Sequence, residues 1–436
     1  MRRLLVVALV SIALVAPAGS ASAEPAPVSG HGLTVVDTTH PGDRIVETTV
    51  STDALQQPVH IRVVLPEGYD ASTERYPVLY LYHGTSGRPS DWTGAGDAVR
   101  TTAGRDVILV LPEAGYDGNG GGWFVDWWNP AGARQQWETF EVDQVIPWID
   151  ANYRTVADRD HRAIAGLSQG GFGAMHAAAR HPELFTSVAT FSGAPEIYRD
   201  PVVRAGASFV IEGTNVALNG GQPFQMFGDP LTNGAHWQGH DPGTLVENLR
   251  GMDVEMWTAT GLPGQLDTLQ SGLSISGNVI ETLTHLSTLA FHRHLDQAGI
   301  AHHLDNYVFG THSFPYWAQD LREYLPRLMD RFAHPSTPTV ITYASTAKAY
   351  AQWDWGVAVH RITAERLTTL AKASAAGFSF TGADAATVVT PPLFPPGTTR
   401  SVRIKRNLAT STVIATADAT GRLKIEVPGT SNVTIS

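Results

Sequence analysis

The pattern Gly-x-Ser-x-Gly occupies residues 166–170 and has Ser168 at its centre. In such a pattern the serine occupies a strained turn between a strand and a helix, and the glycines let neighbouring backbone approach closely. A short expected strand at 161–165, which ends in Ile164-Ala165, precedes the pattern, and a run of small residues at 170–180 follows it. The sequence therefore predicts a strand, a turn and a helix, with Ser168 as a nucleophile for acyl transfer.

A nucleophilic serine of this kind needs two backbone N–H groups that stabilise the oxyanion formed on the attacked carbonyl. The residue after the nucleophile, Gln169, supplies one N–H in this arrangement. The other comes from a loop after an upstream buried strand, and the apolar run that ends at His83-Gly84 makes Thr85 the candidate. We therefore expect Gln169 and Thr85 to form the oxyanion hole.

A general base is expected downstream of the serine, in a loop that follows a late strand. The chain has 17 histidines, so position must decide among them. His312 follows an expected strand at 303–309 and precedes an expected helix at 316–332. We therefore predict that His312 is the base.

The acid that orients the base has two candidates, Asp267 and Glu281, both downstream of an expected strand at 254–258. In most α/β-hydrolases the acid follows this strand closely, which favours Asp267. The residue pattern by itself does not choose between the two carboxylates.

Neither a metal nor a cofactor is expected. The chain has no cysteine, which excludes a thiol nucleophile and cysteine-ligated zinc. His236 and His240 are four residues apart, but Gly239 and the pair Asp241-Pro242 argue against a long helix around them. We therefore predict no zinc site at these histidines.

Strand-like and helix-like segments alternate along most of the chain. The continuous apolar runs have the pattern of strands buried on both faces of a sheet, and the helical segments show apolar residues at helical spacing. Strands are expected at 45–50, 59–65, 76–82, 106–112, 161–165, 254–258 and 303–309, and helices at 137–153, 170–180, 279–298 and 316–332. This alternation predicts the α/β class, with a doubly wound, mostly parallel sheet of the α/β-hydrolase type. Residues 24–43 are expected to form an irregular lead-in.

The composition changes after a proline-containing segment at 334–339, which is expected to be a linker. Beyond it, residues 401–405 and 422–427 alternate apolar and polar side chains. We therefore expect an α/β-hydrolase catalytic domain at 24–333 and a small C-terminal all-β accessory domain at 340–436. A spacer, a cell-surface adhesion module and a structural cap are equally consistent with its sequence.

The first residues have the features of a secretory signal peptide. Arg2 and Arg3 precede an apolar run at 4–15, and Ala21-Ser22-Ala23 provides small residues for cleavage. We predict a signal peptide at 1–23, cleavage after Ala23, and a secreted or cell-envelope location. An uncleaved anchor is the alternative, but the chain lacks a run of about 18 apolar residues, so stable membrane insertion is not expected.

The chain is acidic, with a formal charge of −11 that becomes −13 without Arg2 and Arg3. A negative surface argues against nucleic acid or anionic lipid as a main partner.

Five segments resemble, in order, the Putative esterase family of α/β-hydrolases, and within it the antigen 85 mycolyltransferases. The segments are 79–84, 137–140, 166–168, 237–242 and 310–317, and the resemblance covers about 45–332. In that family the acid is a glutamate at the start of the helix before the histidine strand. The matching position is Glu281, 31 residues before His312, so the resemblance implies a Ser168–His312–Glu281 triad and places Asp267 second.

The chain departs from the family pattern at three positions. The family has an aspartate where this chain has His83, an arginine where it has Ser86, and a tryptophan where it has Phe314. These positions help to hold the sugar and the acyl chain in the family. The resemblance therefore implies ester chemistry but does not extend to a trehalose acceptor or a mycolyl donor.

The sequence is consistent with three functions. The first is an exported serine esterase or acyltransferase that acts on lipid or sugar esters through an acyl-enzyme. The second is a secreted carboxylesterase that hydrolyses acylated polysaccharide or other environmental esters, with carbohydrate contact through the β domain. The third is a non-catalytic binding protein on an inherited scaffold. Small-molecule or glycolipid esters are the expected partners. Four tryptophans form a cluster in the sequence: Trp123, Trp127, Trp128 and Trp137. We expect this cluster either to line an acyl or sugar groove or to pack the loops.

Overall fold

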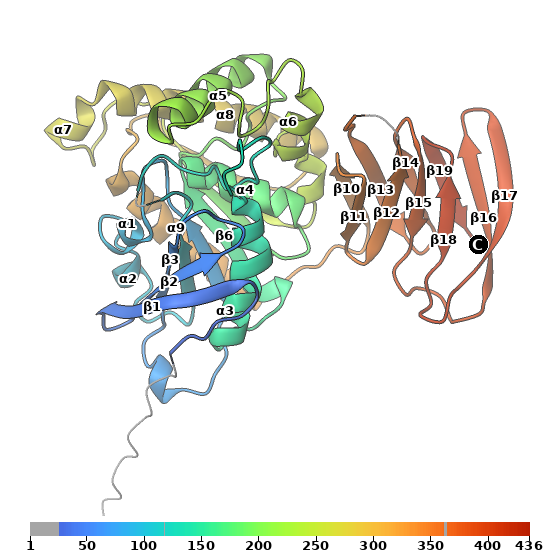
Figure 1. The fold of residues 1–436 in the computed structure, drawn as a ribbon, viewed down its shortest axis with the longest axis horizontal. Helices are drawn as coiled ribbons and strands as arrows, with labels where there is room; N and C mark the ends of the chain where they lie inside the picture. The colour runs from blue at the N-terminus through green and yellow to red at the C-terminus, as the bar shows by residue number, and fades with distance from the viewer. Residues whose placement is uncertain (1–25, 117, 362–363) are drawn as a thin grey trace, which may run out of the picture.

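The computed structural model describes residues 26–116, 118–361 and 364–436 (Figure 1). The expected signal peptide at 1–23 lies outside the described residues. None of the helices within these ranges combines the length and the apolar character that crossing a bilayer requires.

A sheet of nine strands forms the centre of the N-terminal part, in the order β1-β2-β3-β5-β4-β6-β7-β8-β9. The strands from β5 onward in this order pair in parallel, whereas β1, β2 and β3 join the sheet antiparallel. This mostly parallel sheet confirms the predicted fold class. The strands are β1 (Leu33–Gly42), β2 (Ile45–Thr52), β3 (Val59–Val64), β4 (Val78–Tyr82), β5 (Ile108–Pro112), β6 (Arg162–Leu167), β7 (Ser187–Phe191), β8 (Asp253–Thr258) and β9 (His303–Asn306).

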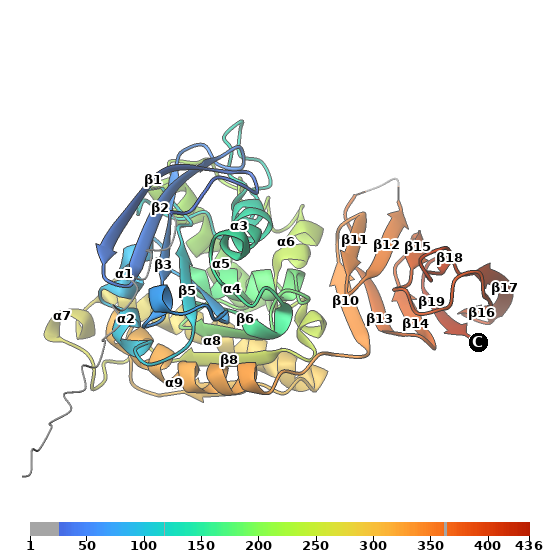
Figure 2. The same ribbon diagram turned by 90° about the horizontal axis from the view of Figure 1, so that it is seen from below.

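Helices cover both faces of this sheet. One face packs against α1, α2 and α9, and the other packs against η2, α3, α4 and α8; α9 runs along one side of the sheet in Figure 2. The helical segments are η1 (Tyr69–Ala71), α1 (Pro89–Thr93), α2 (Ala98–Thr101), the π-helical η2 (Thr139–Val145), α3 (Ile146–Asn152), η3 (Arg159–His161), α4 (Gln169–Arg180), α5 (Pro201–Gly213), the π-helical η4 (Thr214–Leu218), α6 (Gly234–His240), η5 (Val246–Leu249), α7 (Leu269–Gly272), α8 (Ile275–Ala298) and α9 (Phe314–Ala333).

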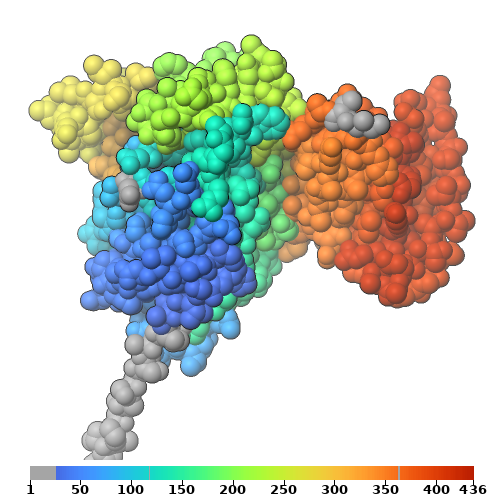
Figure 3. All heavy atoms as spheres, viewed as in Figure 1, coloured from blue at the N-terminus to red at the C-terminus, as the bar shows by residue number. Residues whose placement is uncertain are grey.

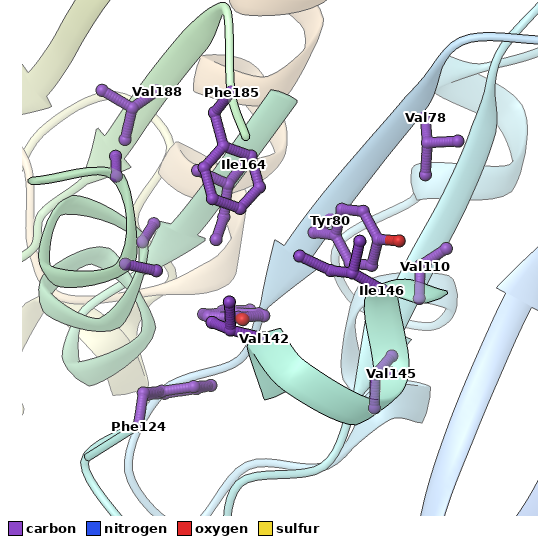
Figure 4. Packing of buried hydrophobic residues seen from close by; sticks show 14 of the residues in the cluster. Val78, Tyr80, Val110, Phe124, Val142, Val145, Ile146, Ile164, Phe185 and Val188 are labelled. Atoms are coloured by element: carbon purple, nitrogen blue, oxygen red, sulfur yellow. The ribbon is translucent and has the colours of Figure 1, made fainter. Parts of the chain in front are cut away.

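The central strand β4 shows why its sequence is continuously apolar. Every residue of β4 is buried, and alternate side chains enter the cores on opposite faces of the sheet. Val78 and Tyr80 lie in the core shown in Figure 4, together with Ile146 of α3, whereas Leu79 lies in the core beneath α9.

Several short helices were not expected from the sequence, and three larger elements also differ from the expectation. The expected irregular lead-in at 24–43 contains β1, an edge strand that pairs with β2. Most side chains of β1 are at least partly exposed, so the strand lacks the buried apolar run that marks the others. Strand β7 and helix α5 were not expected from the sequence at all.

The C-terminal part consists of two antiparallel sheets that enclose one apolar core. The six-stranded sheet has the order β10-β13-β14-β19-β16-β17, and the four-stranded sheet has the order β11-β12-β15-β18. The strands are β10 (Ile341–Ser345), β11 (Ala349–Gln352), β12 (Trp355–His360), β13 (Thr368–Ser374), β14 (Gly377–Thr381), β15 (Ala385–Val389), β16 (Thr399–Arg406), β17 (Ala409–Thr416), β18 (Lys424–Val427) and β19 (Ser431–Ile435). The region is all-β as expected, while the domain boundaries at 333 and 340 stay a prediction.

The C-terminal β region contacts the α/β part at the far end of α4. The Arg180 carbonyl, at the last residue of α4, accepts hydrogen bonds from Tyr343 Oη at 2.7 Å and from Gln352 Nε2 at 3.1 Å. Asn248 exchanges hydrogen bonds with the backbone of Ala344. Since α4 begins beside Ser168, the β region, a separate lobe in Figure 3, meets the end of α4 that is remote from this serine.

Candidate active site

Ser168 lies in the turn between β6 and α4, with backbone angles φ 53° and ψ −122°. A non-glycine residue adopts this strained backbone only when the surroundings enforce it. A Cβ on Gly166 would lie 2.2 Å from the Gly170 carbonyl oxygen, and a Cβ on Gly170 would lie 2.3 Å from the His83 carbonyl oxygen. The two glycines of the pattern therefore permit the close backbone packing that supports the turn.

Ser168 lines a cavity of about 630 Å³, and Thr85, Gln169 and His312 line the same cavity. Its remaining wall comes largely from α5 and α8, which lie together at the top of Figure 1 above α4. The apolar side chains of this wall are Val202, Val203, Phe209, Val210, Leu218, Ile280, Leu283 and Leu286. A cavity with polar groups at one end and an apolar wall beyond them suits an ester with an apolar acyl chain.

His312 contacts Glu281 directly. Glu281 Oε2 lies 2.7 Å from Nδ1 of His312, so a proton on Nδ1 is donated to the carboxylate. The His312 ring also packs edge-on against Trp317, with ring centroids 4.9 Å apart. These two contacts fix the ring orientation, and among the residues that the structure describes no hydrogen bond engages Nε2.

Glu281 is fully buried and its second oxygen is also occupied. Oε1 accepts hydrogen bonds from Ser192 Oγ and from the Ala259 N–H, each at 2.9 Å. These donors follow the ends of β7 and β8, so the sheet itself holds the carboxylate in place. A buried carboxylate with this many donors is a well-positioned partner for an imidazolium.

Asp267, the second candidate acid, occupies a different environment. It accepts hydrogen bonds from Tyr316 Oη at 2.9 Å, from the Gly264 N–H at 2.8 Å, and from the Thr311 hydroxyl. Burial alone would raise the pKa of Asp267, but these hydrogen bonds hold it below its usual value. Within the described residues no hydrogen bond or ion pair joins Asp267 to His312; it anchors the loop through Thr311 instead.

The two expected oxyanion donors are adjacent. The Gln169 side chain donates to the Thr85 hydroxyl at 3.1 Å, which ties the two residues together. In the described part of the chain, the backbone N–H groups of Thr85 and Gln169 donate to no other group. Because Gln169 is the first residue of α4, its N–H also lies at the positive end of the helix dipole.

His83 supports the loop that carries Thr85. The Ala114 N–H donates to Nε2 of His83 at 3.0 Å, so the ring proton is on Nδ1, which lies 2.8 Å from the Gly84 carbonyl oxygen. Burial lowers the pKa of His83, which favours the neutral form of the ring. The two other departures from the family pattern, Ser86 and Phe314, line the cavity.

In the described part of the chain, two groups of side chains have the composition of a metal site: Glu138, His176 and His240, which are buried, and His292, Asp296 and His302, which are more exposed. In the first group His176 Nε2 lies 2.8 Å from His240 Nδ1, within the distance of a direct N–H···N hydrogen bond, and the two ring planes are within 13° of parallel. Glu138 Oε1 accepts from Arg180 Nε and contacts His181 Nε2. The expectation that the site uses no metal stays a prediction.

The four tryptophans of the expected cluster lie in different environments. Trp123 lines the cavity beside Ser168, whereas Trp127 and Trp137 line a second cavity of about 230 Å³. Trp128 is 45% exposed. Only Trp123 is therefore placed to contact a substrate bound at Ser168.

Helix α5 is the largest part of the site that the sequence pattern did not reveal. Its side chains form one wall of the cavity, yet Phe209 is 80% exposed, so apolar residues here do not mark the core. A local signal was present, since Asp200 caps the helix by accepting from the Val202 N–H at 2.8 Å and Pro201 occupies the first turn.

The chain is similar to several known proteins. The family model described as Putative esterase matches residues 52–328. An esterase of Mycobacterium tuberculosis, Rv1288, is 32% identical over 294 residues, which are 65% of this chain. The chain spans 59% of the length of that esterase. The diacylglycerol acyltransferase/mycolyltransferase Ag85B of Mycobacterium leprae is 26% identical over 72% of this chain and 92% of its own length.

A solved structure shows the same fold. MPT51 of Mycobacterium tuberculosis superposes with a TM-score of 0.51 at 21% sequence identity, covering 68% of this chain and 99% of its own. This likeness supports the α/β-hydrolase architecture of the N-terminal part.

Proposed function

The chain belongs to the Putative esterase family, and we propose that it is an exported serine esterase or acyltransferase of the antigen 85 type. One observation carries the proposal: the strained Ser168 shares an apolar-walled cavity with His312, whose Nδ1 is held by the buried Glu281. A nucleophile, a base with a fixed tautomer and an apolar acyl site are what ester cleavage through an acyl-enzyme requires.

In the proposed mechanism Nε2 of His312 takes the proton of Ser168 Oγ as the oxygen attacks the ester carbonyl. The N–H groups of Thr85 and Gln169 stabilise the resulting oxyanion. Glu281 keeps the proton of His312 on Nδ1 and balances the charge of the imidazolium. His312 then protonates the departing alcohol, and water or a second alcohol resolves the acyl-enzyme.

The proposed substrates are lipid or sugar esters, including glycolipids, because the cavity offers a long apolar wall next to the serine. The alternative is a secreted carboxylesterase of acylated polysaccharide. The replacements at Ser86 and Phe314 favour this alternative, because they change cavity positions that the antigen 85 pattern uses for sugar and acyl binding. Export follows from the expected signal peptide at 1–23, and the C-terminal β region would provide a cell-envelope or carbohydrate contact.

The experiment is turnover of short- and medium-chain p-nitrophenyl esters by residues 24–436, with and without trehalose or glucose, with acyl products identified by mass. Free acid as the dominant product at every sugar concentration would identify a hydrolase. Acyl-sugar formed in preference to acid would identify an acyltransferase. If the protein shows no turnover and fluorophosphonate does not label Ser168, the protein is a non-catalytic binding protein.

A further inference from the structure

Charge is divided unequally between the two parts of the chain. Residues 24–339 contain 18 Lys and Arg against 36 Asp and Glu, a formal charge of −18. Residues 340–436 contain 10 Lys and Arg against five Asp and Glu, a formal charge of +5. The C-terminal β region is therefore basic although the protein as a whole is acidic.

The basic residues concentrate on one of the two sheets. The six strands of the larger sheet carry five basic residues and no acidic residue; the basic ones are Lys372, Arg400, Arg403, Lys405 and Arg406. Of the acidic residues in this region, Glu426 lies on β18 of the other sheet, and Asp354, Glu365, Asp384 and Asp418 lie outside the strands. The strands of the larger sheet thus carry no acidic side chain that would neutralise their cations locally.

The strand register places two of these cations on the outer face. Val402 and Ile404 of β16 point into the core, so Arg403 and Lys405 between them point outward. Lys405 pairs with Asn432 on β19 and with Thr410 on β17, and Asn432 in turn pairs with Ser379 on β14.

The neighbouring row has the same character. Arg403 pairs with Thr434 on β19 and with Thr412 on β17. We call the seven outward residues of both rows the β16 platform: Ser379, Arg403, Lys405, Thr410, Thr412, Asn432 and Thr434. Strands lie about 4.8 Å apart, so each of the two rows places one cation beside hydroxyl or amide groups at about that spacing.

The cations of the β16 platform are available to a ligand. Arg403 and Lys405 are exposed, and within the described residues neither forms an ion pair. The adjacent Arg406 is exposed in the same way. By contrast, Arg422 on the other side of the region pairs with Asp354.

We propose that the β16 platform binds an acidic polysaccharide. Arg403 and Lys405 would contact carboxylate groups along the polymer, and the Ser, Thr and Asn side chains around them would exchange hydrogen bonds with sugar hydroxyls. The seven residues include no aromatic side chain for stacking nucleic acid bases. Two exposed apolar side chains of the same hairpin, Leu408 and Ile414, lie outside the two rows, so anionic vesicles are a necessary comparison in the test.

The position of the platform is compatible with catalysis on a bound polymer. Strands β16 and β17 lie at the end of the molecule farthest from α5 and α8, which wall the cavity (Figures 1 and 2). The polymer would therefore hold the enzyme without covering the cavity.

The test is co-sedimentation of residues 24–436 with insoluble polygalacturonate, compared with crosslinked dextran as a neutral polysaccharide. The variant R403Q/K405Q removes both platform cations. The control variant K348Q/K424Q removes two exposed cations that lie off the platform, Lys348 between β10 and β11 and Lys424 on β18. We expect R403Q/K405Q to bind polygalacturonate at least tenfold more weakly, and the control to change affinity less than twofold. Binding of the wild type should also weaken steadily as salt increases.

Other outcomes would overturn the proposal. Equal binding by the two variants would show that the platform cations are not used. Dextran binding as tight as polygalacturonate binding would show that charge is not recognised. Tighter binding of single-stranded DNA, or of phosphatidylglycerol vesicles, would assign the face to nucleic acid or to a membrane. Turnover of a soluble p-nitrophenyl ester should be the same in every variant, so this result is independent of the proposed catalytic function.

Discussion

Glu281 and His312 are 31 residues apart in the chain, and their side chains meet with Oε2 2.7 Å from Nδ1. The contact depends on two elements that the sheet brings together, the second turn of α8 and the loop that follows β9. Because Ser192 and the Ala259 N–H hold the other oxygen of Glu281, the carboxylate cannot turn away without breaking two further hydrogen bonds.

The two candidate acids should respond very differently to loss of charge. Glu281→Gln keeps the shape of the side chain but can present an N–H to Nδ1, which favours the wrong tautomer of His312. We expect kcat for p-nitrophenyl butyrate to fall about 10⁴-fold. Asp267→Asn should lower kcat less than tenfold, because Asp267 bonds to Thr311 and Tyr316 rather than to His312. A severe loss in the Asp267 variant alone would assign the acid to that residue.

The nucleophile and the base should behave as a unit. Ser168→Ala should lower kcat by about 10⁶, and Ser168→Ala combined with His312→Ala should lower it no further. The measurement is steady-state turnover with fluorophosphonate labelling, which should mark the wild type and neither variant. Retention of most activity in Ser168→Ala would exclude a serine mechanism, provided that the melting temperature is unchanged.

The serine turn should be intolerant of a methyl group on Gly166. A Cβ there would lie 2.2 Å from a backbone oxygen, which cannot move without disturbing the start of α4. We expect Gly166→Ala to lower the free energy of unfolding by about 3 kcal/mol or more, as overpacking does in cores. Gly213→Ala at the end of α5, where a Cβ meets nothing within 4 Å, is the control and should raise it by up to about 1 kcal/mol. Denaturant unfolding curves of the two variants give both values.

The sequence could predict Ser168 and the strand–turn–helix around it because that signal is local to a few residues. The choice of acid was not local: both carboxylates follow β8, and only the resemblance to a family favoured Glu281. The hydrogen bonds from Ser192 and Ala259 that distinguish Glu281 arise from side-by-side packing of β7 and β8, which residue spacing does not show.

The same reasoning explains the elements that sequence patterns did not reveal. Periodicity finds segments that bury one face, but α5 directs apolar side chains into a cavity and β1 lies at the sheet edge with most of its side chains at least partly exposed. A functional wall and an edge strand both lack the core-facing pattern on which sequence interpretation depends.

Stability below neutral pH should depend on His176. Burial lowers the pKa of His176 to about 3, and it also lowers the pKa of His240, which is hydrogen-bonded to it. An unfolded histidine titrates near pH 6.5. Between these pH values the unfolded chain binds a proton that the folded chain does not. The free energy of unfolding therefore falls as pH falls, by up to about 1.4 kcal/mol per pH unit for each such group.

His176→Gln should remove that contribution while keeping a polar partner for His240. Buried carboxyls such as Glu141 and Asp320 have raised pKa values and act in the opposite direction, so the wild-type curve alone is a mixture. Subtracting the unfolding free energy of the variant from that of the wild type isolates the contribution of His176. This difference should fall by about 1 kcal/mol as the pH is lowered from 6 to 5. Curves that stay parallel over this range would show that His176 is charged in the folded state.

Substitution of Phe209 should change selectivity for acyl chain length without affecting the chemistry. Phe209 lines the cavity from α5 and is 80% exposed, so Phe209→Ser removes apolar wall without opening the core. If the acyl chain lies along this wall, loss of its contact with one aromatic side chain should cost about 1 to 1.5 kcal/mol, or about 5- to 10-fold in kcat/KM for a dodecanoyl ester. Acetate turnover should not change, because a two-carbon acyl group does not extend along the wall. Phe224→Ser, an exposed aromatic outside the cavity lining, is the matched control. Equal loss for acetate and dodecanoate would place the acyl chain elsewhere and make α5 a purely structural wall.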